Sequence, residues 1–218
     1  MEEDIPEFND LKPRPYQVEA YRKALRSNLL LVLPTGLGKT LVSAMLAYTY
    51  IKQNKKVIMI SPTRPLVDQH FQTMTKLFAG QDIRIRSLTG HDPVDKRMSE
   101  WAEGQFIIST PQTVEKDIKR EIVFMNNFYL LIVDEAHRAT GNYAYVNVAR
   151  EFQNLPDRRI LAMTASPGSK NEKVDEIKDN LKIANVMIRT DDDPDIAPYA
   201  KGSDTEKIQL CQEECIKI

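Results

Sequence analysis

Short runs of apolar residues alternate with stretches of helical periodicity along most of this 218-residue chain. The apolar runs cover residues 29–33, 57–61, 83–88, 106–110, 129–134, 160–164 and 186–189, and the helical stretches cover residues 39–53, 66–78, 94–103, 114–120, 143–153 and 172–181. Several runs are apolar at almost every position, as a strand covered on both faces requires. The alternation predicts an α/β fold, with a mostly parallel sheet and helices on both of its faces.

The length fits one well-buried domain, and we expect it to cover residues 1–190. Residues 190–203 contain two prolines, a glycine and a run of aspartates, a composition typical of a linker. Residues 191–218 are therefore predicted to be a linker and the start of a following segment. That segment includes one further candidate strand at residues 206–210, and we expect it to continue beyond residue 218.

Composition excludes some classes of protein and leaves others open. The net charge is −1, which does not indicate a strongly basic nucleic-acid surface, although acidic residues near both ends can mask a local basic patch. No apolar run is long enough to span a membrane and no signal peptide is recognisable, so we expect a soluble, intracellular protein. The two cysteines, Cys211 and Cys215, are predicted to be free thiols, and no zinc site is expected.

The residues between the first apolar run and the first helical stretch are typical of a phosphate-binding loop. Gly36 and Gly38 allow successive backbone N–H groups to point inward, and the following helix start adds partial positive charge. Lys39 can reach the β- and γ-phosphates of a nucleotide, and the Thr40 hydroxyl can bind Mg²⁺. Leu33 stands where the general pattern has glycine. The alternative is an ordinary glycine-rich turn between a strand and a helix.

Two acidic residues stand where the apolar run 129–134 ends. Parallel strands deliver such residues to the sheet edge where ligands bind. Asp134 is therefore predicted to hold Mg²⁺ opposite Thr40, and Glu135 to polarise an attacking water as general base. The alternative is an ordinary helix start, where the helix dipole stabilises acidic side chains.

Six short segments in order resemble the motifs of superfamily 2 helicases. They are residues 14–17 (Arg-Pro-Tyr-Gln, the adenine-recognition motif), 33–40 (motif I), 61–66 (motif Ia), 109–112 (motif Ib), 134–137 (motif II in its DEAH form) and 163–167 (motif III). Residues 34–40 and 134–145 are similar, more narrowly, to archaeal Hef helicase-nucleases and to the Fanconi-anaemia M-type DNA translocases.

The resemblance implies a RecA-like P-loop NTPase that uses ATP and Mg²⁺, and it assigns roles to particular residues. The catalytic group would be Lys39, Asp134, Glu135 and His137, with Thr40 and Asp134 on the metal. The nucleotide would be bound by Arg14, Tyr16, Gln17, Thr35, Gly36, Leu37, Gly38, Lys39 and Thr40, although residues 14–17 by themselves are equally typical of a helix start. Nucleic acid would contact Thr63, Arg64, Thr89, Gly90, Thr110 and Gln112, whose alternative role is local helix capping. Thr164 and Ser166, with His137, would couple the two sites, whereas His70, His91 and Trp101 are expected to be structural.

The function that the resemblance implies is the ATP-binding lobe of a DNA helicase or translocase acting on forked or branched DNA, in repair or fork restart. Its partners would be DNA and a second RecA-like lobe with arginine fingers, without which this lobe should be weakly active or inactive. The location would be the nucleoid region of a prokaryotic cytoplasm or a eukaryotic nucleus. Alternatives are a lobe of an RNA helicase or RNA sensor of the RIG-I type, a non-catalytic interaction module, and a P-loop kinase for a small metabolite.

Overall fold

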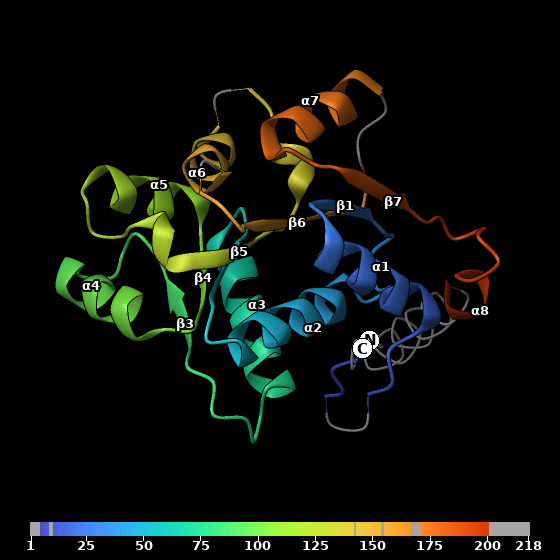
Figure 1. Cartoon of the computed structure of the whole chain (residues 1–218), viewed down its shortest axis with the longest axis horizontal. Coiled ribbons are helices and arrows are strands. Elements are labelled where there is room, and N and C mark those ends of the chain that lie inside the picture. Colours follow the sequence, from blue (N-terminus) through green and yellow to red (C-terminus); the bar gives the residue numbers. More distant parts are fainter. Residues whose placement is uncertain (1–4, 9–10, 142, 154, 167–170, 201–218) are drawn as a thin grey trace, which may run out of the picture.

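The computed structural model describes residues 5–8, 11–141, 143–153, 155–166 and 171–200, and these residues form one sheet covered by helices (Figure 1). The strands are β1 (Leu29–Val32), β2 (Lys56–Ile60), β3 (Ile85–Leu88), β4 (Phe106–Ser109), β5 (Phe128–Val133), β6 (Arg159–Thr164) and β7 (Asn185–Ile188). Their order across the sheet is β3-β4-β2-β5-β6-β1-β7, and every pairing is parallel. The predicted parallel sheet is confirmed.

The helices are α1 (Pro15–Arg26), α2 (Lys39–Lys52), α3 (Arg64–Leu77), α4 (Val94–Glu103), α5 (Pro111–Lys119), α6 (Ala144–Gln153), α7 (Asn171–Leu181) and α8 (Ala197–Ala200), with the short 3-10 turns η1 (Met125–Asn127) and η2 (Ala136–Arg138). One apolar core lies between the sheet and α1, α2 and α3. A second core lies on the opposite face, under α4, α5, α6 and α7. Helices therefore cover both faces, as the alternating pattern predicts.

Among the described helices, α1 is absent from the predicted helical stretches, and the sequence offered it only as a possible helix start at residues 14–17. Its buried residues are Tyr16, Gln17, Ala20, Tyr21 and Ala24, so small and polar side chains make up much of its inner face. Helical periodicity is recognised from large apolar residues, and a helix that packs closely through alanine lacks that signal. Pro15 begins the helix, where its missing N–H costs no hydrogen bond.

The parallel arrangement brings the loops after the inner strands to a single edge of the sheet. Residues 33–38 follow β1, residues 61–63 follow β2, residues 134–135 follow β5 and residues 165–166 follow β6. Ligands of open α/β sheets bind at this carboxyl edge. The described part of the chain contains no helix long and apolar enough to cross a membrane. The candidate strand at 206–210 and both cysteines lie outside the described residues.

Candidate functional site

The loop between β1 and α2 has the backbone that a phosphate cradle requires. Gly36 and Gly38 have φ values of +85° and +79°, a region in which side chains other than glycine are strained. A Cβ atom at Gly38 would also lie 2.3 Å from Nε2 of Gln17. The positive φ therefore favours glycine at position 38, and the close approach of the Gln17 side chain places the loop directly against α1.

Lys39 folds back over this loop. Its Nζ donates to the carbonyl oxygens of Leu33 at 2.6 Å and Pro34 at 3.1 Å. Burial lowers the pKa of Lys39, while the charges of Glu135 and Asp134 act in the opposite direction. The amine thus lies within electrostatic reach of both carboxylates, although its hydrogen bonds go to backbone carbonyls.

The start of α1 supports the same loop from its inner side. The Tyr16 hydroxyl donates to the carbonyl oxygen of Leu37 at 2.9 Å, and Nε2 of Gln17 donates to that oxygen at 3.2 Å. Oε1 of Gln17 accepts from the backbone N–H of Arg14 at 2.8 Å. Tyr16 and Gln17 are 1% and 3% exposed. Among Arg14, Tyr16 and Gln17, the three predicted nucleotide-binding residues of this motif, only Arg14 is partly exposed.

Asp134 is held in place by two side chains from other elements. Ser61, at the end of β2, donates to Oδ2 at 2.9 Å, and Nε2 of His70 in α3 lies 2.8 Å from the same oxygen. Burial by itself would raise the pKa of Asp134, but the hydrogen bond and charge of His70 and the bond from Ser61 outweigh it, so the pKa lies below its usual range. The carboxylate is ionised and oriented, as a metal-binding group requires.

His70 and Tyr145 belong to this site although the sequence analysis did not place them there. His70, expected to be structural only, contacts Asp134 directly. Val67, His70 and Met74 share the buried face of α3, so a histidine on the inward face of the helix after β2 was the available signal. The Tyr145 hydroxyl donates to the backbone carbonyl of Asp134 at 3.0 Å, and burial raises the pKa of Tyr145, which keeps that donor protonated.

A chain of polar contacts leads from the acidic strand end to the loop after β6. Glu135 has a φ of +50°, an uncommon conformation for a residue other than glycine. Its Oε2 lies 3.2 Å from Nδ1 of His137, and Nδ1 lies 3.1 Å from Oγ1 of Thr164. Thr164 in turn donates to the carbonyl oxygen of Ser166 at 2.8 Å. The predicted coupling residues are therefore neighbours in space.

The six residues predicted to contact nucleic acid divide into two groups. Thr63, Arg64, Gly90 and Gln112 are exposed, and the Thr63 hydroxyl makes no capping bond to α3. Thr89 and Thr110 are nearly buried. Thr89 donates to Oδ2 of Asp92 at 3.1 Å, and Thr110 caps α5 by accepting from the backbone N–H of Thr113. In this structure Thr110 therefore acts as a helix cap, the alternative role considered for it above.

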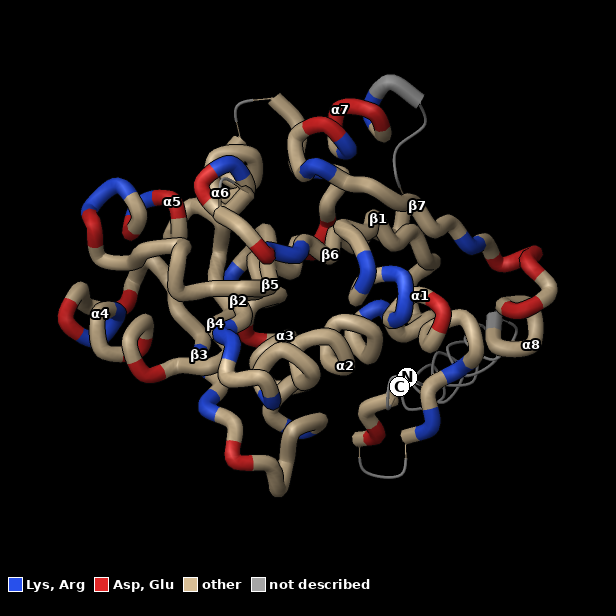
Figure 2. The backbone as a smooth tube through the Cα atoms, viewed as in Figure 1, with Lys and Arg blue, Asp and Glu red and all other residues tan. Residues whose placement is uncertain are grey.

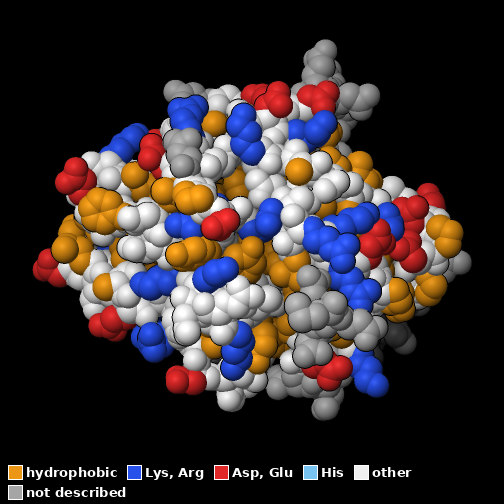
Figure 3. Space-filling view, viewed as in Figure 1, with side chains coloured by type: hydrophobic (Ala, Val, Ile, Leu, Met, Phe, Trp, Pro, Cys, Tyr) orange, Lys and Arg blue, Asp and Glu red, His pale blue; other side chains and the backbone are white. Residues whose placement is uncertain are grey.

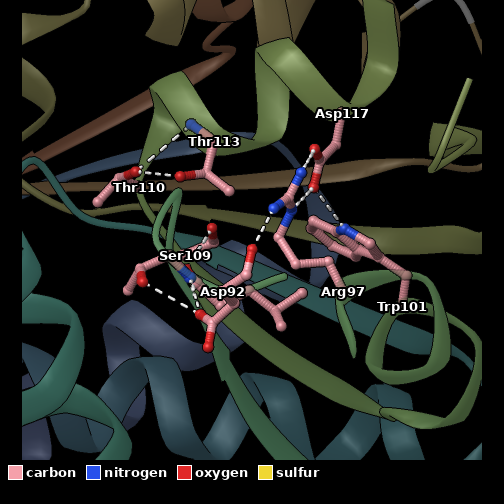
Figure 4. A network of polar contacts seen from close by, with 9 residues as sticks. Asp92, Arg97, Trp101, Ser109, Thr110, Thr113 and Asp117 are labelled. Carbon is pink, nitrogen blue, oxygen red and sulfur yellow. Dashed lines mark hydrogen bonds and ion pairs between the residues drawn. The ribbon is translucent and has the colours of Figure 1, made fainter. Parts of the chain in front are cut away.

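A buried charged cluster braces this second group (Figure 4). Nε and Nη2 of Arg97 donate to the two carboxylate oxygens of Asp117 at 2.8 and 2.9 Å. The indole N–H of Trp101 donates to Oδ2 of Asp117 at 2.9 Å. Arg97 also donates to the backbone carbonyl of Asp92, the residue that holds Thr89. The cluster thus links α4 and α5 to the loop that carries Thr89 and Gly90.

The two remaining residues expected to be structural behave differently from each other. Trp101 is 4% exposed and packs edge-on against Phe128, with ring centroids 5.8 Å apart. It is a core residue, as predicted. His91 is exposed, in the loop before α4.

Comparisons with known proteins agree with this geometry. A family model described as "DEAD/DEAH box helicase" matches residues 14–174. The chain is 41% identical over 200 residues to "ATP-dependent DNA helicase mph1" of Sclerotinia sclerotiorum, covering 90% of this chain and 16% of that protein. It is 39% identical over 200 residues to "DEAD-box ATP-dependent RNA helicase FANCM" of Arabidopsis thaliana, covering 90% of this chain and 15% of that protein.

A solved structure shares the fold. The crystal structure of the Pyrococcus furiosus Hef helicase domain superposes with a TM-score of 0.81 at 41% identity, over 86% of this chain and 40% of that one. The chain therefore spans less than a fifth of the two helicase sequences and 40% of the chain in the solved structure.

Proposed function

Because the chain belongs to the DEAD/DEAH box helicase family, we propose that it forms the ATP-binding lobe of a DNA helicase or translocase acting on forked or branched DNA in repair or fork restart. One observation carries the proposal. Lys39 lies within the electrostatic reach of Asp134 and Glu135 at the carboxyl edge of the sheet, beside a glycine-rich loop. An amine, two carboxylates and a phosphate-binding loop are the groups that hydrolysis of a nucleoside triphosphate needs.

The phosphates of ATP are expected to bind the loop formed by residues 35–40. Backbone N–H groups and the start of α2 provide partial positive charge there. Lys39 would exchange its bonds to the Leu33 and Pro34 carbonyls for bonds to the β- and γ-phosphates. Burial already lowers the pKa of Lys39, so a phosphate partner stabilises the charged amine.

Thr40 and Asp134 are the residues that would hold Mg²⁺. Magnesium prefers oxygen ligands and is bound by one or two carboxylates together with substrate phosphates. Within the described ranges no group of three or more His, Cys, Asp or Glu residues is placed to hold a metal, which suits a cation that arrives with the nucleotide. Bound there, magnesium would neutralise charge on the transferred phosphoryl group.

Glu135 would take the proton of the attacking water. Two observations support this role: it follows Asp134 directly with a left-handed backbone, and its Oε2 lies 3.2 Å from Nδ1 of His137. His137 and Thr164 would then report the state of the γ-phosphate to the loop after β6. Their contacts support the coupling role, which needs movement against a second lobe.

DNA is expected to lie over the exposed residues Thr63, Arg64, Gly90 and Gln112. Hydroxyls, amides and backbone N–H groups of this kind hold phosphates without reading sequence. A second RecA-like lobe with arginine fingers would complete the motor, because such arginines contribute ~10³–10⁵ in rate. Tested by itself, this 218-residue chain is expected to bind ATP and hydrolyse it near background.

Nucleotide binding tests the proposal. Fluorescent ATP should bind the wild-type chain with magnesium at millimolar or lower concentration, Lys39→Ala should lose binding, and Glu135→Gln should keep it. In a longer protein that includes the second lobe, Glu135→Gln should abolish DNA-stimulated hydrolysis. Full turnover by that variant would refute the assigned base, and absence of any ATP binding by the wild type would refute the nucleotide site.

An RNA helicase lobe is the second candidate, because two similar proteins are named as ATP-dependent RNA helicases. The exposed contacts address phosphates, which DNA and RNA share. Competition between forked DNA and double-stranded RNA, at one fixed salt concentration, separates the two. We expect forked DNA to displace the probe at the lower concentration.

A further inference from the structure

The residues that follow β7 turn back and attach to α1 instead of leaving the domain. Arg189 donates through Nη2 to Glu19 at 2.8 Å and through Nε to Asp195 at 2.9 Å. Ile196 is fully buried in the core that α1 shares with α2 and α3. Figure 2 shows the acidic residues of this segment between β7 and α8, and Figure 3 shows acidic side chains beside basic ones at the same end of the molecule. The segment is anchored at two points before it reaches Tyr199.

Tyr199, in α8, lies against Arg14, the half-buried first residue of the adenine-recognition motif. The guanidinium carbon of Arg14 stands 4.2 Å from the centre of the Tyr199 ring. Nη1 of Arg14 also donates to the Tyr16 hydroxyl at 2.9 Å. The rings of Tyr16 and Tyr199 are 6.0 Å apart at 63°. One face of the Arg14 guanidinium is therefore covered by an aromatic ring, and one edge is fixed by a hydrogen bond.

These contacts continue to the phosphate-binding loop. The Tyr16 hydroxyl that accepts from Arg14 donates to the carbonyl oxygen of Leu37. Tyr199 contacts Arg14, Arg14 contacts Tyr16, and Tyr16 contacts the loop where the nucleotide phosphates are expected to bind. Tyr16 is buried and Arg14 is half-buried, so between these two residues the guanidinium is the group open to a base joined to those phosphates.

We propose that Tyr199 is a positioning residue for the adenine of the bound nucleotide: its ring holds the Arg14 guanidinium in the plane on whose other face the base packs. The inference deepens the proposed function and rests on it. A guanidinium is planar and stacks on aromatic surfaces, so a ring on one side restrains the orientation that it offers on the other. Restraining a long side chain before binding reduces the entropy lost when the ligand binds.

The phosphates are expected to bind residues 35–40 and not Tyr199. The effect of a Tyr199 substitution on affinity should therefore appear only for ligands that carry the base. Affinities of the wild type and variants are measured for ATP and for inorganic tripolyphosphate, each with magnesium, by competition against a fluorescent ATP analogue. Tyr199→Ala should weaken ATP binding about fivefold, as expected for loss of one cation–π contact. Its affinity for tripolyphosphate should stay unchanged. Tyr199→Phe keeps the ring and should restore ATP binding.

Two further variants separate positioning from stability. Tyr199→Leu keeps bulk on the core side without an aromatic face, so it should fold and still show the base-dependent loss. Phe124→Ala removes an aromatic ring of greater exposure, 55% against 38%, far from α1 in sequence, and should change neither affinity. Thermal unfolding of each variant establishes that it is folded.

The outcomes divide without overlap. A loss for ATP alone that Tyr199→Phe reverses supports the inference. Equal losses for ATP and tripolyphosphate, no loss for either, or tighter ATP binding by Tyr199→Ala would overturn it, the last by showing that the ring competes with the base. If the wild type fails to bind ATP at all, the proposed function fails instead, which Lys39→Ala as the non-binding reference makes visible.

Discussion

Two charged clusters lie on different parts of the sheet, and they differ in how their charges are satisfied. Around the phosphate-binding loop, Lys39 bonds to backbone carbonyls, and Asp134 is held by Ser61 and His70. Between α4 and α5, Arg97 and Asp117 are paired directly through two hydrogen bonds. Lys39 can exchange its bonds to neutral carbonyls for bonds to a ligand, whereas a buried charge such as Arg97 loses much more when it is separated from its opposite charge.

The difference assigns the two clusters different tasks. The side chains of Arg97 and Asp117 are 4% and 0% exposed, so their pairing decides how α4 and α5 dock. Lys39 and Glu135 are partly exposed and face a loop built for an anion. The first cluster is expected to control stability, and the second to control ligand binding.

The largest expected effect is the loss of one partner of the buried pair. Asp117→Ala should lower the free energy of unfolding by about 3–5 kcal/mol, because Arg97 would keep a buried charge without its partner. Urea unfolding measures this, with the double change Arg97→Met and Asp117→Leu as the control, expected to cost much less. Lys39→Met should cost under about 1 kcal/mol, since the amine is only partly buried. Equal costs for Asp117→Ala and Lys39→Met would break the comparison.

The next effect concerns two buried serines that differ in their acceptors. Ser61 donates to the ionised Asp134, and Ser109 donates to the carbonyl of Leu88 at 2.8 Å. Both serines are 0% exposed. Ser61→Ala should cost about 1.5–3 kcal/mol and Ser109→Ala about 1 kcal/mol, because hydrogen bonds to charged groups are stronger. Only Ser61→Ala should also weaken binding of ATP with magnesium; a matching loss in Ser109→Ala would contradict the assignment.

A smaller effect of opposite sign is expected at Glu135. Its positive φ strains the backbone, and glycine removes that strain at some cost in unfolded-state entropy. Glu135→Gly should therefore raise the free energy of unfolding by about 0.5 kcal/mol while abolishing hydrolysis. Glu135→Gln, which keeps the strain, should leave stability unchanged. Thermal unfolding of both variants gives the answer, and a less stable glycine variant would show that the conformation carries no strain.

The smallest effect is a pH dependence at Asp92. Burial raises the pKa of Asp92, but bonds from Lys96 and Thr89 outweigh it and bring the pKa below its usual value of 3.8. A carboxyl whose pKa is lower in the folded state stabilises above that usual value, and the contribution disappears as pH falls through the folded-state pKa. The stabilities of wild type and Asp92→Asn should therefore differ at neutral pH and converge in acid. A constant difference across that range would exclude this linkage.

Much of the fold followed from the chain's local patterns. Seven apolar runs of strand length predicted the seven observed strands, with β3 shorter by two residues because the backbone turns at residues 81–83. The length of helix α1 was not predicted beyond a possible helix start at residues 14–17, because alanine and a buried glutamine form much of its inner face. Gly36, Gly38, Lys39 and Asp134 were recognisable because each follows a strand, in the loop or at the helix start that comes next, and local sequence marks such places.

The sequence by itself determined the order of strands and helices along the chain, and it marked the loops that carry the phosphate-binding and acidic residues. These features depend on neighbours only a few positions away. Only the tertiary structure decided which distant side chains meet: His70 and Asp134 are 64 residues apart, and Arg97 and Asp117 are 20 apart. Arg14 meets Tyr199 from the other end of the described chain. Contacts of this kind depend on strand register and on which helix face packs inward. The local periodicity of the sequence does not predict them.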